Sequence, residues 1–136
     1  MAGKELHLSL VSPASTYFDG PVRSVQIPVH DGLIGVMADH APMVSTLGFG
    51  LLTIRGEDGE KSFVIDGGFL EILNNRLTVL ANSAEALEDV DLEAAQKEFE
   101  EAQSMVAAGE KQVEERMERI AAARTRIKYA TPAGRV

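Results

Sequence analysis

The chain has 136 residues, a formal net charge of −8 at pH 7 and 45% hydrophobic residues. This length holds one ordinary domain or two small ones, with enough apolar content for a packed core. The acidic balance argues against a nucleic-acid partner, because a phosphate backbone would be repelled. No apolar run approaches the roughly 20 residues that span a bilayer, and the N-terminus has no apolar segment of signal-peptide type, so we expect a cytoplasmic protein.

Glycines and prolines punctuate short alternating runs in the first part of the chain. The pattern predicts strands over residues 5–11, 22–29, 33–37, 50–55, 61–65, 69–73 and 76–80, with a shorter one over 43–46. Asn74 and Asn75 predict a tight turn, since asparagine accepts a left-handed conformation. Pro28 predicts that its strand lies at a sheet edge or a bulge. Tyr17 and Phe18, beside an expected turn over residues 19–21, are assigned to the core.

The periodicity changes near residue 85, after which apolar residues recur at intervals of three and four as far as Ile127. Two helices of about 18 to 20 residues, joined near Gly109, are expected to form an antiparallel hairpin. Alanines dominate their contact, so little apolar area is buried. The chain is therefore predicted to be α+β, with an N-terminal antiparallel β-sandwich over 1–84 and a C-terminal antiparallel helical hairpin over 85–136. Whether the hairpin is a movable arm or lies fixed on the sandwich stays open.

Charge is unevenly spread over the helical part. Acidic residues crowd the first helix, whereas basic residues gather late, at Arg116, Arg119, Arg124, Arg126 and Lys128. Acids near a helix start and bases near a helix end are favourable by themselves, typically by a few tenths of a kcal/mol. The basic end is therefore either helix electrostatics or a docking surface for an acidic partner.

Catalysis is not indicated. Asp39 and His40 resemble half of an acid-base arrangement, but neither Ser45 nor Ser62 lies in a nucleophile signature with them. The chain has no cysteine, and its three histidines are too scattered to predict a metal site. We therefore expect no catalytic, cofactor or metal site, and interpret the segment around His40 and Pro42 as a rigid loop.

Several segments in succession resemble the epsilon subunit family of the rotary F-type ATP synthases, called delta in mitochondria. They are Leu10-Val11-Ser12-Pro13, Gly32-Leu33-Ile34-Gly35-Val36-Met37 with His40-Ala41-Pro42, and Gly67-Gly68-Phe69-Leu70-Glu71 with Leu77-Thr78-Val79-Leu80-Ala81. Each motif alone is weak, but their order and spacing before a helical hairpin are specific. The resemblance covers the whole chain.

The resemblance implies a noncatalytic central-stalk subunit that turns with the rotor and couples proton-driven rotation to ATP synthesis. Its sandwich would bind the gamma subunit and the polar loops of the c-ring, and its hairpin would restrain ATP hydrolysis by contacting the beta subunits. The beta and alpha subunits of the catalytic head are both implied partners. By matching segments, the implied contacts are Asp31, Gly32 and Leu33 with the c-ring, His40, Ala41, Pro42 and Met43 with gamma, and Arg116, Arg119, Arg124, Arg126 and Lys128 with beta.

Some bacterial relatives bind ATP through an acid at the first helix start, followed three residues later by arginine. This chain retains Asp91 but has Ala94 where the arginine would stand, so we expect weak or no ATP binding and no cofactor. The resemblance places the protein peripherally on the cytoplasmic face of the bacterial inner membrane, held there only through the complex. The alternative is a free-standing adaptor or regulatory module with a movable helical arm, which would not co-purify with membrane-bound ATP synthase.

Overall fold

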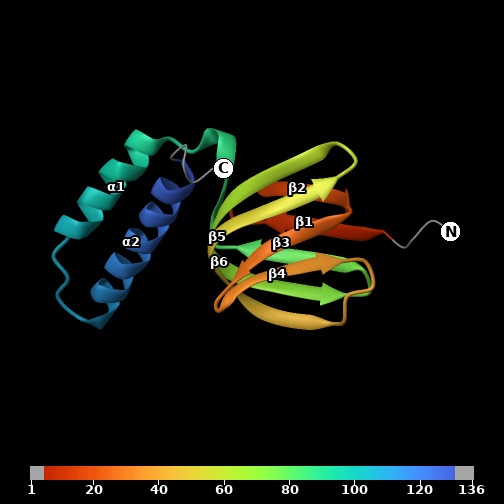
Figure 1. Cartoon of the computed structure of the whole chain (residues 1–136). Coiled ribbons are helices and arrows are strands. Elements are labelled where there is room, and N and C mark those ends of the chain that lie inside the picture. The colour runs from red at the N-terminus through yellow and green to blue at the C-terminus, as the bar shows by residue number, and fades with distance from the viewer. Residues whose placement is uncertain (1–4, 131–136) are drawn as a thin grey trace. The chain divides into compact units, whose positions relative to one another are not determined.

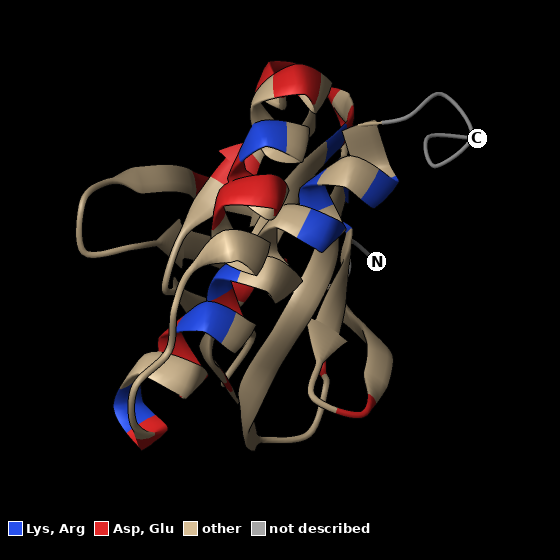
Figure 2. Ribbon diagram, turned by 90° about the vertical axis from the view of Figure 1, so that its left-hand side faces the viewer, with Lys and Arg blue, Asp and Glu red and all other residues tan. Residues whose placement is uncertain are grey.

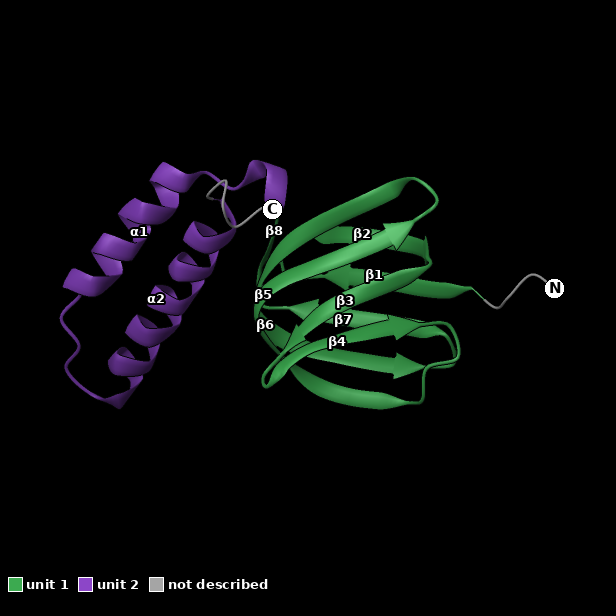
Figure 3. Cartoon of the chain, viewed as in Figure 1, with its two compact units in different colours: residues 1–86 green, residues 87–136 purple. Residues whose placement is uncertain are grey.

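The computed structural model describes residues 5–130. The chain divides into two compact units, of which the first ends at Ala86 and the second begins at Leu87 (Figure 3). The first contains all the strands and the second contains two α-helices, so the predicted α+β fold is confirmed. Within residues 5–130, none of the helices has the length and apolar composition needed to cross a bilayer.

The first unit is an eight-stranded sheet that folds into a sandwich (Figure 1). Its strands are β1 (Leu6–Val11), β2 (Thr16–Val22), β3 (Ser24–Val29), β4 (Gly32–Met37), β5 (Met43–Gly56), β6 (Gly59–Leu73), β7 (Arg76–Ala81) and β8 (Ala84–Ala86). They follow the order β2-β1-β7-β6-β5-β3-β4, with β8 paired to β6. The pairs are antiparallel except β1 with β7, which run parallel. The expectation of a wholly antiparallel sandwich therefore needs this one correction.

Two long strands, β5 and β6, replace the four shorter ones predicted over residues 43–46, 50–55, 61–65 and 69–73. On its side away from β5, β6 pairs with β8 at residues 63–65 and with β7 from Gly68 onward. Gly67 and Gly68 have φ angles of 80° and 128°, where residues with a Cβ are strained. A Cβ on Gly68 would lie 2.1 Å from the carbonyl oxygen of Leu80, so this glycine permits the close approach of two strands.

The sandwich has a continuous apolar core formed by its own strands. Its largest fully buried side chains include Leu8, Leu10, Ile27, Leu52 and Ile65. In β1 and β7, buried side chains alternate with more exposed ones, as a half-buried strand requires. Tyr17 and Phe18 pack, partly buried, against this core, which confirms their assignment.

One expectation about the strands was wrong, and another was met in one of its two alternatives. The Asp19-Gly20-Pro21 segment is not a turn but the middle of β2, which pairs only with β1 at the edge of the sheet. An edge strand tolerates Pro21 because its outer N–H groups need no partner. Pro28 was expected at a sheet edge or at a bulge, and because β3 lies between β5 and β4, the edge is excluded. The register of β3 with β5 is interrupted between Gln26 and Val29, and this irregularity accommodates Pro28.

The second unit contains a 3₁₀ turn (Leu87–Asp89), α1 (Leu92–Ser104) and α2 (Glu110–Ala130). Asp91 caps α1, since its carboxylate accepts the N–H groups of Glu93 and Ala94. With 13 residues α1 is shorter than predicted, because the chain becomes extended at Met105. Val106 therefore lies outside the helix, 85% exposed, instead of extending the apolar stripe. The buried residues of both helices are alanines, so their contact is shallow.

Candidate interaction surfaces

The turn between β3 and β4 presents the first group of candidate contact residues. Val29 pairs with Gly32, which leaves His30 and Asp31 as a two-residue hairpin connection. Gly32 has a φ of 146°, a conformation that glycine adopts without strain. Leu33, immediately after it, is 63% exposed. A carboxylate and a large apolar side chain therefore project from one rigid hairpin tip.

The second group lies in the loop between β4 and β5, at residues 38–42, and at Met43, the first residue of β5. Nδ1 of His40 is 2.8 Å from the carbonyl oxygen of Ala41, so the ring makes its hydrogen bond within the loop. Ala41 and Pro42 are exposed, whereas Met43 packs partly buried against the core. The loop thus combines an anchored end with an exposed apolar surface.

The two groups lie at opposite ends of β4. This strand has six residues and, at about 3.3 Å per residue, separates its ends by roughly 17 Å. The structure therefore does not gather Asp31 and His40 into one site. It presents the two groups of candidate contact residues separately, at the two ends of one strand.

A shallow hollow of about 330 Å³ lies beside the second group, lined by Pro42, Met43, Val44, Glu71, Ile72 and Leu73. Val44 is 74% exposed and Leu73 is 47% exposed. Sequence reasoning missed both residues, because a β-strand pattern shows which side chains alternate but not which outer ones adjoin a loop. In the register of β5 with β6, Glu71 lies opposite Val44 and Ile72 lies opposite Met43. The hollow therefore lies on the β5–β6 pair.

The outer side of the same strands carries further exposed apolar residues. Phe69 on β6 is paired with Leu80 on β7, and the two are 57% and 51% exposed. Thr46 on β5 lies directly opposite Phe69. Large apolar side chains that adjoin one another on a surface are typical of an interaction site.

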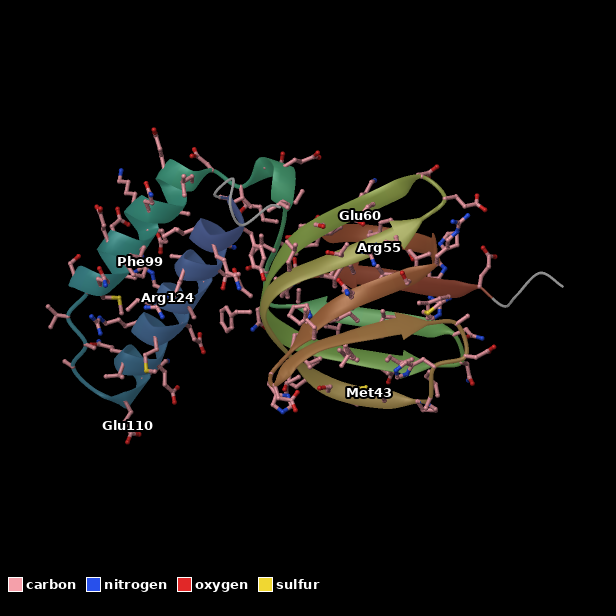
Figure 4. The ribbon with its side chains drawn as sticks, in the orientation of Figure 1. Met43, Arg55, Glu60, Phe99, Glu110 and Arg124 are labelled. Atoms are coloured by element: carbon pink, nitrogen blue, oxygen red, sulfur yellow. The ribbon has the colours of Figure 1, made fainter. Side chains whose placement is uncertain are left out.

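The basic residues of α2 contact other groups of the chain. Nε and Nη2 of Arg119 donate to Oε1 of Glu98 on α1 at 2.9 and 2.6 Å. Arg116 donates to the carbonyl oxygen of Gln103 at 2.9 Å, and the guanidinium of Arg124 lies 5.7 Å from the ring centroid of Phe99. Figure 4 shows Phe99 and Arg124 directed toward one another across the hairpin.

The remaining two basic residues make contacts within α2. Arg126 donates to the carbonyl oxygen of Ala122 at 3.3 Å, and the ammonium of Lys128 lies 5.2 Å from the ring of Tyr129. Figure 2 shows acidic and basic positions side by side along the hairpin. The five basic residues therefore do not form a patch separate from the acids. Most of them are paired across the two helices.

Asp91, the retained residue of the implied ATP motif, serves as the helix cap. Its Oδ1 accepts from the N–H of Glu93 at 2.9 Å and from that of Ala94 at 3.4 Å. Ala94 offers no cation beside it. The geometry explains Asp91 by a structural role.

The family model described as the ATP synthase, Delta/Epsilon chain, beta-sandwich domain matches residues 5–87. An ATP synthase epsilon chain of Leptospira interrogans is 36% identical over 105 residues, which cover 77% of this chain and 83% of the relative. A chloroplastic ATP synthase epsilon chain of Pyropia yezoensis is 32% identical over 130 residues, covering 94% and 97%. The similarity to the Pyropia yezoensis chain thus extends over both the sandwich and the helical hairpin.

Two solved structures have the same fold. A chain in the Euglena gracilis mitochondrial ATP synthase, solved as OSCP/F1/c-ring, aligns with a TM-score of 0.75 at 25% identity, covering 89% of this chain and 78% of that one. A chain of the Tetrahymena thermophila mitochondrial ATP synthase central stalk and c-ring aligns with a TM-score of 0.72 at 16% identity, covering 96% and 100%. With the sandwich matched over residues 5–87, the chain belongs to the ATP synthase delta/epsilon family.

Proposed function

We propose that this noncatalytic subunit of the ATP synthase rotor stalk joins gamma to the c-ring through the two ends of β4. Asp31, Gly32 and Leu33 contact the polar loops of the c-ring, and His40, Ala41, Pro42 and Met43 contact gamma. The observation that carries the proposal is the separation of these two exposed groups on one short strand with a buried core beneath it. Such a rigid spacer transmits rotation between two partners without a site of its own for chemistry.

The hollow beside Met43 supports the gamma contact. Its exposed apolar side chains adjoin the loop, and a partner that covers them would remove apolar surface from water. The neighbouring Phe69 and Leu80 extend this apolar surface across β6 and β7. The membrane association that follows is peripheral and depends on the complex. In this proposal the subunit lies on the cytoplasmic side of a bacterial inner membrane.

The hairpin is the proposed restraint on ATP hydrolysis. In this proposal Arg116, Arg119 and Arg124 contact acidic segments of the beta subunits once they are released from α1. Arg126 and Lys128, farther along α2, belong to the same contact. The Arg119–Glu98 pair and the stacking of Arg124 on Phe99 support a competition, because an acidic partner must displace groups of α1 to reach these cations. Inhibition then depends on how easily the two helices separate.

The test measures ATP hydrolysis by a reconstituted alpha, beta and gamma complex with the full-length chain and with a chain that ends at Ala86. This end keeps β8, which pairs with β6, and it keeps the core of the sandwich complete. Binding by both chains with inhibition by the full-length chain alone supports the anchor and the restraint together. Binding by both chains without inhibition would contradict the proposed restraint on ATP hydrolysis. Binding by neither chain would favour the alternative of a free-standing adaptor.

A further inference from the structure

Three residues other than glycine have a positive φ in the described part of the chain, and two of them meet. They are Asp39, Asn74 and Asn75, with φ angles of 67°, 49° and 61°. Asp39 lies in the loop after β4, whereas the two asparagines form the turn between β6 and β7. Left-handed residues other than glycine persist where the surrounding structure holds them, and such positions are enriched at binding and switch sites.

The two segments are joined by a pair of side-chain hydrogen bonds. The N–H of Asp39 donates to Oδ1 of Asn75 at 2.5 Å, and Nδ2 of Asn75 donates to Oδ1 of Asp39 at 3.3 Å. An asparagine amide has both an acceptor and a donor, so one side chain satisfies the backbone and the carboxylate of Asp39 together. We call this pair the Asp39–Asn75 clasp.

The clasp is fixed to the sheet from the Asn75 side. The carbonyl oxygen of Asn75 accepts the N–H of His7 at 2.9 Å, which ties the turn to the adjoining strand β1. Arg76, the next residue, pairs with Leu73 across the β6–β7 hairpin. The turn is therefore tied to the sheet at β1 and at the end of the β6–β7 hairpin, while the loop that it holds lies between two strands.

We infer that Asn75 is a positioning residue for the loop at residues 38–42, holding it in the conformation that binds the partner at His40 and Pro42. The inference rests on the proposed gamma contact. The ring of His40 makes its hydrogen bond to the neighbouring residue Ala41, and Pro42 has no N–H to donate. Neither of these groups therefore ties the loop to the sheet. The clasp supplies that tie at Asp39, the residue immediately before His40.

A residue that only stabilises the fold would be distinguished from a positioning residue by a matched pair of variants. Asn75→Gly removes the clasp but keeps the positive φ and the backbone bond to His7. Asn74→Gly makes the same chemical change at the neighbouring turn position, whose side chain does not contact Asp39 in the described interactions. Glycine adopts both conformations without strain, so the two variants differ in the clasp.

The experiment measures the affinity of each full-length variant for the alpha, beta and gamma complex, together with hydrogen exchange of the free chain. Losing two hydrogen bonds that hold a binding loop lowers its competent population, so Asn75→Gly should weaken binding roughly tenfold. The amides at residues 39–41 should exchange faster in that variant while those of β1 and β7 do not change. Asn74→Gly should match the wild type in both measurements, and Asp39→Asn, which keeps an acceptor for Asn75, should retain most of the affinity.

Equal affinity and equal loop exchange for the two glycine variants would overturn the inference. Faster exchange with unchanged affinity would also overturn it, because the clasp would then order the loop without serving the contact. A failed gamma contact is recognised separately with Pro42→Gly and His40→Ala. If these variants bind like the wild type while the Asn75→Gly loop exchanges faster, the contact has been assigned to the wrong surface and the proposed function fails there.

Discussion

The pairing of Arg119 with Glu98 makes a specific prediction about inhibition. Glu98→Gln keeps the size of the side chain and removes its charge, so α1 competes less for the guanidinium of Arg119. The hairpin should then release its basic residues more readily to an acidic partner. The change is expected to strengthen inhibition of ATP hydrolysis, although it removes a favourable contact within the subunit.

The structure limits the size of the effect. Both nitrogens of Arg119 reach the same oxygen of Glu98, at 2.9 and 2.6 Å, and the two side chains are 41% and 46% exposed. Glu101 lies farther away, at 4.0 Å. A pair with this exposure contributes about 0.5–1 kcal/mol, so the opening equilibrium should shift by a factor of roughly two to five.

The assay is ATP hydrolysis by the alpha, beta and gamma complex, titrated with each full-length variant at low ionic strength. The concentration for half-inhibition should fall about two- to fivefold for Glu98→Gln, by the pair energy given above. Glu100→Gln is the matched control, since Glu100 is an exposed acid of the same helix whose carboxylate has no described partner on α2. Equal effects of the two variants, or weaker inhibition by Glu98→Gln, would refute the competition.

Three further predictions concern stability and contact. Gly68→Ala should lower the free energy of unfolding by about 2–4 kcal/mol, because the added Cβ would meet the carbonyl oxygen of Leu80 and the φ angle is positive. Gly56→Ala is the control: its Cβ would have open space, so the free energy of unfolding in denaturant should change by less than about 0.5 kcal/mol. Asp91→Ala should cost α1 about 1 kcal/mol through loss of its cap, seen as reduced helicity by circular dichroism, while isothermal calorimetry detects no ATP binding by either chain. Leu33→Ala should leave unfolding within about 0.5 kcal/mol of the wild type and weaken binding to detergent-solubilised c-ring; unchanged binding would remove Leu33 from that contact.

The sequence predicted those elements whose local signals agree with their place in the fold. Turn chemistry at Asn74 and Asn75 and alternation in β1 and β7 located these strands closely. The strand β2 was missed because its Asp19-Gly20-Pro21 segment has the composition of a turn. Its position at the sheet edge is a tertiary property that relieves the usual penalty on proline.

Some residues of the candidate surfaces could be predicted from the sequence, whereas others could not. Residues at the β3–β4 turn and in the 38–42 loop could be selected from the chain because turns and loops have recognisable composition. The clasp could not, since Asp39 and Asn75 lie 36 positions apart and meet only when β4 and the β6–β7 hairpin are folded. The partners of Arg116 and Arg119 were equally hidden, because charge composition does not show which cations are already paired.

Different interactions stabilise the interior of each of the two units, and this difference bears on their roles. The sandwich core consists mainly of buried leucine, isoleucine and valine side chains, whereas the buried residues of the helices are alanines. Charged contacts such as Arg119 with Glu98 therefore carry a large share of the specificity between α1 and α2. Salt screens exposed ion pairs but leaves apolar burial largely intact. Raising ionic strength should consequently loosen the hairpin while the sandwich stays folded, which separates a responsive element from a permanent anchor within one short chain.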